Sequence, residues 1–311
     1  MRFQYQELER DGQTLDVLTD GASGLRIAVS RRGAELVSLA RREANGEWIG
    51  FLHRDSEVCP ALSGWGNHAT VMGYYIHRLK NGRTSYRGQE IRGGTHSFLR
   101  HKEFAPPRFA GDDSASLTYR ITPEQLARDE YPLRVALTLR YAIADDALTV
   151  SFQFVNEEPE LTAHVSFGLH PGFTAASLES ADVLMPEGDY IRHLAPGDLL
   201  SGDTETFHHA GGPMPFKKSD LPGSFLLELK NVAEAKFAFV DNSSGRRVNL
   251  GFSEAPYITI WSSGEPFICV EPCWGLPDHH NQRPFEQKLG IQPIKPGTTL
   301  TRSCTISPIL P

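Results

Sequence analysis

The chain has 311 residues, of which 40% are hydrophobic, so it can bury the core of one large domain. Its formal net charge is −7, which disfavours a general nucleic-acid-binding protein, because such proteins are basic. Apolar runs stay shorter than the roughly 18 residues that span a bilayer, and Met1–Glu7 lacks the apolar stretch of a secretory signal. We therefore expect a single domain over residues 1–311 in the cytoplasm, with no membrane or nucleic-acid partner and with reduced cysteines (59, 269, 273 and 304).

Most of the chain has the pattern of short strands joined by turns. The one clear helix signal is Thr122–Gln125, a capping box with proline at the first helical position, which predicts about two turns. Two alternating apolar stripes, Val135–Ile143 and Leu148–Phe154, predict strands, and Asp145–Asp146 between them predicts a hairpin turn. The stretch 186–222 is either a strand pair with long loops or an insertion over a cleft. The pattern as a whole predicts an all-β fold.

Two apolar runs about a hundred residues apart each end in a titratable side chain just before a proline. The segment 161–170 alternates as a half-buried strand and places His164, Ser166 and His170 on its polar face. The segment 267–271 ends in Glu271, and a carboxylate after such an apolar run is awkward in a core because a buried charge needs partners. A carboxylate and an imidazole that meet in one cleft form an acid–base pair able to work near neutral pH. We therefore expect an enzyme that acts on a neutral, hydroxyl-rich substrate.

Several short motifs, in a shared order and spacing from about Gly24 to Pro308, resemble the aldose 1-epimerase (mutarotase) family. The segments that carry the resemblance are Gly73–Leu79, Gly94–Arg100, Tyr131–Leu133, Phe167–Phe173, Pro256–Trp261, Cys269–Gly275 and Lys288–Ile291. The resemblance implies a galactose mutarotase-like β-supersandwich, in which large antiparallel sheets pack face to face with few short helices. It also implies a sugar in an open cleft and interconversion of the α and β anomers of an aldose.

The implied reaction opens a hemiacetal and closes it again, which requires an acid and a base and neither metal nor cofactor. A carboxylate with an ordinary pKa of about 4.3 is mostly ionised at neutrality, and a histidine near 6.5 is protonated at modest cost. We therefore assign Glu271 as the base and His170 as the acid, with His96 assisting on the ring-oxygen side. Arg78 is expected to bind sugar hydroxyls through its planar donor fork. The expected substrate-binding residues are Arg78, Arg100, Trp261 and His77.

The sequence departs from the family pattern at three places that concern the sugar. The family's Asn-Arg pair is His77-Arg78 here, and the Gly-Gly that often follows the first histidine is Ser97-Phe98. The family's sugar-binding aspartate has Asp241 as its candidate counterpart, although the Asp-Asn-Ser-Ser-Gly setting of that residue is typical of a turn.

A basic segment raises a second hypothesis about the substrate. Between Arg78 and Arg108 the chain has eight basic residues and two acidic ones. Hydrated hairpin surfaces explain this pattern simply, and an anion pocket near His96 is the alternative, which would suit a hexose 6-phosphate. A sugar-binding protein without catalysis on the same scaffold is a further alternative. A glycosidase is disfavoured, because that chemistry usually uses two carboxylates across the bond.

Neighbouring histidines and cysteines do not predict a metal site. His208-His209 and His279-His280 are adjacent pairs, and adjacent side chains on a strand point to opposite faces, so surface loops are the favoured interpretation. Cys269 and Cys273 flank Glu271, but nothing nearby indicates a low thiol pKa, and a packing role is favoured. The expected partner is a small-molecule sugar, and the expected state is a monomer or homodimer.

Overall fold

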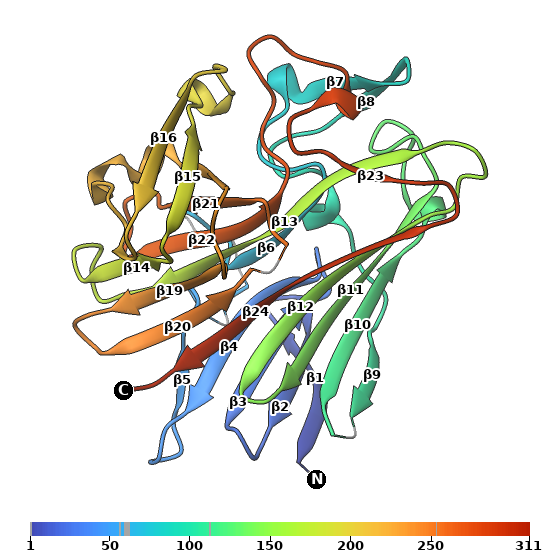
Figure 1. The fold of residues 1–311 in the computed structure, drawn as a ribbon. Coiled ribbons are helices and arrows are strands. Elements are labelled where there is room, and N and C mark those ends of the chain that lie inside the picture. The colour runs from blue at the N-terminus through green and yellow to red at the C-terminus, as the bar shows by residue number, and fades with distance from the viewer. Residues whose placement is uncertain (1, 56, 59–62, 112, 253) are drawn as a thin grey trace.

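The computed structural model describes residues 2–55, 57–58, 63–111, 113–252 and 254–311 (Figure 1). Nearly all of its regular structure is β-strand, which confirms the all-β prediction. Helix in this part of the chain is limited to short 3₁₀ turns: η1 (Lys80–Gly82), η2 (Leu99–His101), η3 (Pro123–Gln125), η4 (Pro196–Asp198), η5 (Lys218–Gly223) and η6 (Phe285–Gln287). None of the described helices is long and apolar enough to cross a membrane.

Three large antiparallel sheets and one small hairpin make up the molecule. The first sheet has the order β1 (Phe3–Arg10), β2 (Gln13–Asp20), β3 (Leu25–Ser30), β4 (Glu35–Arg42), β5 (Trp48–Gly50). The second has the order β17 (Gly212–Pro213), β14 (Ala181–Met185), β19 (Lys236–Asp241), β20 (Arg246–Gly251), β24 (Thr299–Ile309), β12 (Ala147–Asn156), β11 (Val135–Ala144), β10 (Ala115–Ile121), β9 (Arg108–Gly111).

The third sheet carries most of the site described below. Its order is β16 (Thr204–His209), β15 (Gly188–His193), β18 (Phe225–Leu229), β21 (Tyr257–Trp261), β22 (Phe267–Trp274), β13 (Ala163–Thr174), β23 (Gln292–Ile294), and β6 (Ala69–Tyr74) also pairs with β13. The hairpin of β7 (Arg83–Tyr86) and β8 (Gln89–Arg92) is separate. In Figure 1 this hairpin and the β15–β16 pair both project from the upper end of the molecule.

The hydrophobic core joins all three sheets, because alternate side chains of their strands face one another. Every second residue of Val135–Ile143 in β11 and of Leu148–Phe154 in β12 is fully buried, as the apolar stripes predict. Both Asp145 and Asp146 have positive φ, 47° and 64°, and they form the two-residue turn between Ala144 and Ala147. The predicted hairpin is therefore confirmed.

Three sequence predictions differ from the structure in detail. The capping box at Thr122 and Gln125 is present, but it starts only the single 3₁₀ turn η3, in place of two helical turns. Strand β13 continues past His170 to Thr174 and is buried on both faces rather than half-buried, because β6 and β22 flank it and other layers cover it. The stretch 186–222 contains the strand pair β15–β16, and its loops also reach the cleft, so both interpretations of it are partly right.

The cysteines and the aromatic residues near the motifs lie mostly in the core. Cys269, Cys273 and Cys304 are buried free thiols, whereas position 59 lies outside the described residues. Phe173 and Trp274 are fully buried, so they pack in the core and do not face a ligand. Their packing holds β13 and β22 in a fixed register, which positions the side chains on the opposite face of these strands.

Candidate active site

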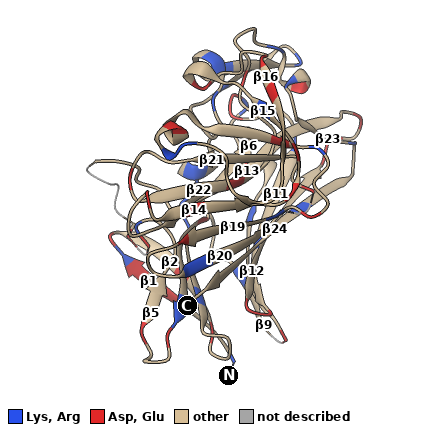
Figure 2. Cartoon of the chain, turned by 60° about the vertical axis from the view of Figure 1, so that its left-hand side comes forward, with Lys and Arg blue, Asp and Glu red and all other residues tan. Residues whose placement is uncertain are grey.

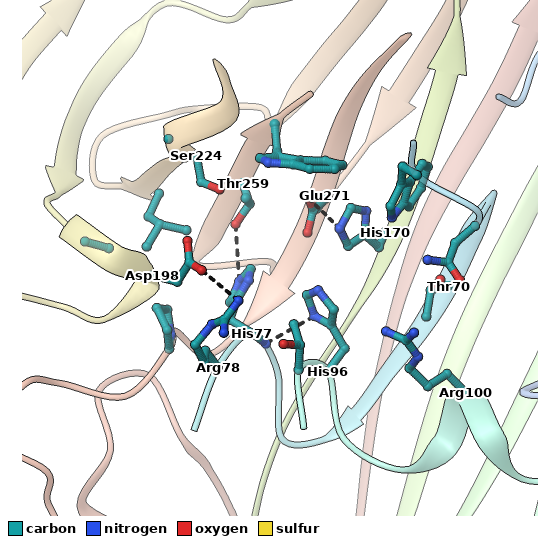
Figure 3. Close-up of a pocket in the computed structure, with 18 of the residues that line it drawn as sticks. Thr70, His77, Arg78, His96, Arg100, His170, Asp198, Ser224, Thr259 and Glu271 are labelled. Carbon is teal, nitrogen blue, oxygen red and sulfur yellow. Dashed lines mark hydrogen bonds and ion pairs between the residues drawn. The ribbon is translucent and has the colours of Figure 1, made fainter. Parts of the chain in front are cut away.

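A cavity of about 430 Å³ lies over one face of the third sheet. Its walls come from segments far apart in the sequence, including loops that precede and follow β6, the turn η2, the turn η4 and the strands β13, β21 and β22. The side chains that line it, most of them labelled in Figure 3, include Trp65, Thr70, His77, Arg78, His96, Arg100, His170, Asp198, Ser224, Thr259, Trp261 and Glu271.

The floor of the cavity is the pair His170 and Glu271, which lie on the neighbouring strands β13 and β22. The flanking partners Gly168↔Cys273 and Gly172↔Cys269 place the two residues opposite each other. A Cβ atom at Gly168 would lie 2.5 Å from the carbonyl oxygen of Pro272, so only glycine permits this close approach of the strands. The Nε2 atom of His170 lies 3.4 Å from Oε1 of Glu271 (Figure 3).

His77 and His96 lie on two loops that hold each other in place. The backbone N–H of His96 donates to the carbonyl oxygen of His77 at 2.8 Å, and the backbone N–H of His77 donates to Nδ1 of His96 at 3.2 Å. Because Nδ1 of His96 accepts a hydrogen bond, the ring proton of the neutral imidazole lies on Nε2. The His96 ring meets that of His170 edge to face, with 5.0 Å between the ring centroids. His96 is therefore arranged as a hydrogen-bond donor beside the floor pair.

Two tryptophans form an aromatic wall next to His170. Trp65 stacks on the His170 ring with 5.0 Å between centroids, and it meets Trp261 edge to face at 5.7 Å. The backbone N–H of Trp65 donates to the carboxylate of Glu265 at 2.9 Å, which ties its loop to the loop after β21. Indole faces offer an apolar surface on which the C–H face of a sugar ring can lie. Trp65 was not among the predicted site residues. The only sequence feature that could have indicated it is its position as an aromatic residue between Gly64 and Gly66.

The rim of the cavity carries two arginines with different surroundings. Arg78 forms an ion pair with Asp198 of η4 at 2.8 Å, and both side chains are about half exposed, so the pair contributes only about 0–1 kcal/mol to stability. The guanidinium of Arg100 lines the cavity in Figure 3, and no described residue forms a hydrogen bond or ion pair with it. A donor fork without a protein partner is available to a ligand.

Burial changes the ionisation expected for the floor pair. It raises the pKa of Glu271, and burial together with the neighbouring His77 and Arg100 lowers the pKa of His170 to about 3. The pKa of His96 is also lowered, first by burial and then by His170. The neutral forms of Glu271 and His170 are thus favoured over the ion pair that ordinary pKa values predict.

Two atoms of the floor pair are left without protein partners. Oε2 of Glu271 and Nδ1 of His170 are buried, and neither forms a hydrogen bond with a described residue. Leaving a buried polar atom without a partner typically costs about 1–3 kcal/mol. Such atoms are consistent with a site that is completed by a bound molecule.

We expect Glu271→Gln to stabilise the protein at alkaline pH. Because burial raises the pKa of Glu271, the folded wild type holds a proton that the unfolded chain releases above the ordinary value of 4.5, so wild-type stability falls as the pH rises toward the raised pKa. Glutamine has no such proton. The variant should gain at least about 1 kcal/mol relative to the wild type between pH 4.5 and pH 8. Denaturant unfolding at the two pH values measures this gain, and an unchanged difference would contradict the raised pKa.

The structure brings all seven predicted site residues to one cavity: His77, Arg78, His96, Arg100, His170, Trp261 and Glu271. Asp241 does not line it, since its buried carboxylate accepts hydrogen bonds from Ser180, Ser243 and Ser244 at the turn after β19, as its sequence setting indicates. Asp198 and Thr259 also line the cavity but were not predicted. Asp198 ends the turn η4 within the stretch 186–222, where no motif marks it, whereas Thr259 lies in β21, inside the segment Pro256–Trp261 that resembles the family.

The basic segment and the histidine pairs have mainly surface roles. Of the eight basic residues between Arg78 and Arg108, only Arg78 and Arg100 line the cavity, and basic and acidic residues alternate along much of the ribbon (Figure 2). His208 and His209 lie on strand β16, so the prediction of a loop there was wrong, and His208 binds Asp189 at 2.8 Å. No His208, His209, His279 or His280 side chain joins a ligand cluster among the described residues.

Comparison with known proteins places the chain in a family. A model of the aldose 1-epimerase family matches residues 16–307, so the chain belongs to that family. A galactose mutarotase related enzyme from Lactobacillus acidophilus has 22% identity, with 98% of this chain and 97% of that chain covered and a TM-score of 0.79. A galactose mutarotase-like protein from Lactobacillus casei ATCC 334 has 20% identity, coverage of 98% and 100%, and a TM-score of 0.77.

A third solved structure, galactose 1-epimerase from Lactobacillus acidophilus NCFM, has 13% identity, coverage of 100% and 99%, and a TM-score of 0.72. No curated protein matches the chain by sequence. At these low identities the likeness establishes the galactose mutarotase-like fold, and the resemblance stated from the sequence motifs is confirmed at the level of the family.

Proposed function

We propose that the protein is an aldose 1-epimerase that interconverts the α and β anomers of an aldose. The observation that carries this proposal is the contact of 3.4 Å between His170 and Glu271 on the floor of a sugar-sized cavity. The two oxygens that exchange protons in mutarotation, the C1 hydroxyl and the ring oxygen, are bonded to the same carbon. An acid and a base that serve them must therefore lie close together, as these two side chains do.

In the proposed reaction the charged pair, which burial makes the less populated form, is the reactive one: ionised Glu271 takes the proton of the C1 hydroxyl while protonated His170 gives a proton to the ring oxygen. The bond between C1 and the ring oxygen breaks, the C1–C2 bond rotates, and the reverse transfers close the ring on the other carbonyl face. Both transfers convert the charged pair into the neutral pair. Because burial disfavours the charged pair, it favours proton flow in the direction of ring opening.

The remaining cavity residues would hold the sugar during the rotation. His96, with its proton on Nε2, is placed to donate to the ring oxygen beside His170. Arg78 and Arg100 offer planar donor forks to hydroxyls, and the Arg78–Asp198 pair is exposed enough to exchange its partner. Trp261 supplies an apolar face, and His77 lines the same wall. Polarimetry of α-glucose and α-galactose tests the proposal, and sugar binding without faster mutarotation would favour the sugar-binding alternative.

A phosphorylated aldose is a second candidate substrate, favoured by the surroundings of Arg100. A further cavity of about 310 Å³ shares Gly66, Asn67 and Arg100 with the first, and Arg32 and His101 also line it. An anionic substituent of the sugar could extend into this second chamber, which two arginines and the carboxylate of Glu35 line, and bind Arg100, which lacks a described partner.

We expect Arg100→Gln to separate the two candidate substrates. If the substrate is a hexose 6-phosphate, the variant should lower kcat/KM for that substrate by roughly 10- to 100-fold, because a hydrogen bond between charged groups contributes about 1.5–3 kcal/mol. The kcat/KM for the uncharged hexose should change much less. Parallel assays on glucose and glucose 6-phosphate measure both values. A wild-type preference for glucose, with equal losses in the variant, would remove the phosphorylated candidate.

A further inference from the structure

Strand β22 carries two thiols beside the proposed catalytic carboxylate. Cys269, Glu271 and Cys273 occupy alternate positions, so all three side chains point to the same face of the strand. His170 lies next to Glu271 on the neighbouring strand β13, and His77 lies within reach of the same face. The donor atoms of His77, Glu271 and Cys273 lie within 4.8 Å of one another, as do those of His170, Cys269 and Glu271. The epimerase reaction uses neither thiol.

The first of these groups has the spacing that a tetrahedral cation requires. Nε2 of His77 lies 3.7 Å from Sγ of Cys273. Nitrogen and sulfur ligands at the usual Zn²⁺ distances of about 2.0–2.3 Å are separated by about 3.6 Å in a tetrahedral site. The Thr259 hydroxyl lies 3.3 Å from Nε2 of His77 and 3.6 Å from Sγ of Cys273, so it must turn away from Nε2 when that atom binds a cation.

The third ligand is available and the site has an entry path. Oε2 of Glu271 is buried and has no hydrogen-bond partner among the described residues. His77 and Glu271 both line the cavity, so a cation can reach them from solvent. Cys273 is fully buried and does not line the cavity, but its sulfur lies within 4.8 Å of the donor atoms of these two residues.

We propose that His77, Glu271 and Cys273 form a binding site for a thiophilic divalent cation of the Zn²⁺ type, with a fourth position open to the cavity. The mixture of nitrogen, oxygen and sulfur donors suits such a cation better than Mg²⁺ or Ca²⁺, which take oxygen ligands. Burial raises the pKa of both Glu271 and Cys273, so binding releases the carboxyl proton of Glu271 and the thiol proton of Cys273 to solvent, because carboxylate and thiolate are the binding forms. Binding also occupies a lone pair of Glu271, so the bound cation blocks the proposed base and inhibits mutarotation.

The test uses Co²⁺ alone as a probe on the full chain, after treatment with a chelator and without oxygen. Tetrahedral Co²⁺ with a thiolate ligand gives a charge-transfer band in the near ultraviolet and intense d–d bands in the visible, and added Zn²⁺ should abolish them. This readout is independent of epimerase activity, so it stands or fails separately from the proposed function. Loss of an outer-shell partner typically weakens metal binding about 10- to 100-fold, so Cys273→Ser should weaken Co²⁺ binding at least about 100-fold.

Cys269→Ser is the matched control, because this thiol lies on the same strand and face at the same spacing from Glu271. It should retain the charge-transfer band. Loss of the band in Cys269→Ser but not in Cys273→Ser would overturn the proposal in favour of the His170 group, and a wild type without any band would overturn it outright. Circular dichroism checks folding. If Cys273→Ser does not fold, His77→Gln on a different segment replaces it, and unchanged Co²⁺ affinity in that variant would also contradict the site.

Discussion

Glu271→Gln is expected to lower kcat for aldose mutarotation by at least about 100-fold, because a positioned acid or base typically contributes about 10²- to 10⁴-fold. Glu271 is only 1% exposed, so a replacement must fit the same buried space. Glutamine has nearly the same size as glutamate, so the fold should tolerate the change. It keeps a polar group beside His170 but cannot accept the proton of the C1 hydroxyl. Polarimetry of freshly dissolved α-galactose or α-glucose gives the rate, and circular dichroism confirms that the sheets are intact.

The chain offers a matched control for this experiment. His193 and Glu228 form a second histidine–carboxylate pair on neighbouring strands of the same sheet, with 2.9 Å between Nε2 and Oε2. Glu228 does not line the main cavity. Glu228→Gln should therefore leave kcat within experimental error of the wild type. Equal losses in both variants would mean that damage to the sheet, and not loss of the base, explains the result for Glu271.

His170→Asn should cause a loss of at least about 100-fold in kcat for the same physical reason. Asparagine can still form hydrogen bonds at this position, but it cannot deliver a proton to the ring oxygen at any pH used in the assay. His193→Asn is the control for the loss of an imidazole from the same sheet. Near-normal mutarotation in His170→Asn would remove this residue from the proposed mechanism.

The double variant Glu271→Gln, His170→Asn tests whether the two residues work as a unit. Groups that act together in one step show losses that are far from additive. The double variant should therefore be little slower than the slower single variant. Multiplication of the two single losses would instead indicate that the residues act independently, despite their contact in the structure.

Local sequence patterns predicted the strands whose two faces have different surroundings. In β11 and β12 one face meets the core, so alternate residues are apolar and the turn residues Asp145 and Asp146 tolerate positive φ. Strand β13 was harder, because sheet neighbours and other layers bury both of its faces and the polar residues Ser166 and His170 are nevertheless inside. The capping box at Thr122 shows that a helix start signal does not set the length of the helix.

The candidate site was predicted only where a motif surrounds the residue. His96, His170 and Glu271 stand in short segments that resemble the family, whereas Trp65 and Asp198 reach the cavity through loops whose conformation depends on distant contacts. Trp65 is held by Glu265 and Asp198 by Arg78, pairs that are far apart along the chain. Ionisation was also beyond the reach of the sequence, because the pKa shifts of Glu271 and His170 arise from burial in the folded protein.

The division of the cavity between strands and loops has an evolutionary consequence. His170 and Glu271 stand on adjacent strands whose close approach depends on glycine, so few substitutions there preserve the spacing. Arg78, Arg100 and Asp198 stand on loops and single turns, which tolerate insertion and replacement more readily. We therefore expect that exchange of rim segments can change which sugar is accepted, while the proposed reacting pair tolerates far less change.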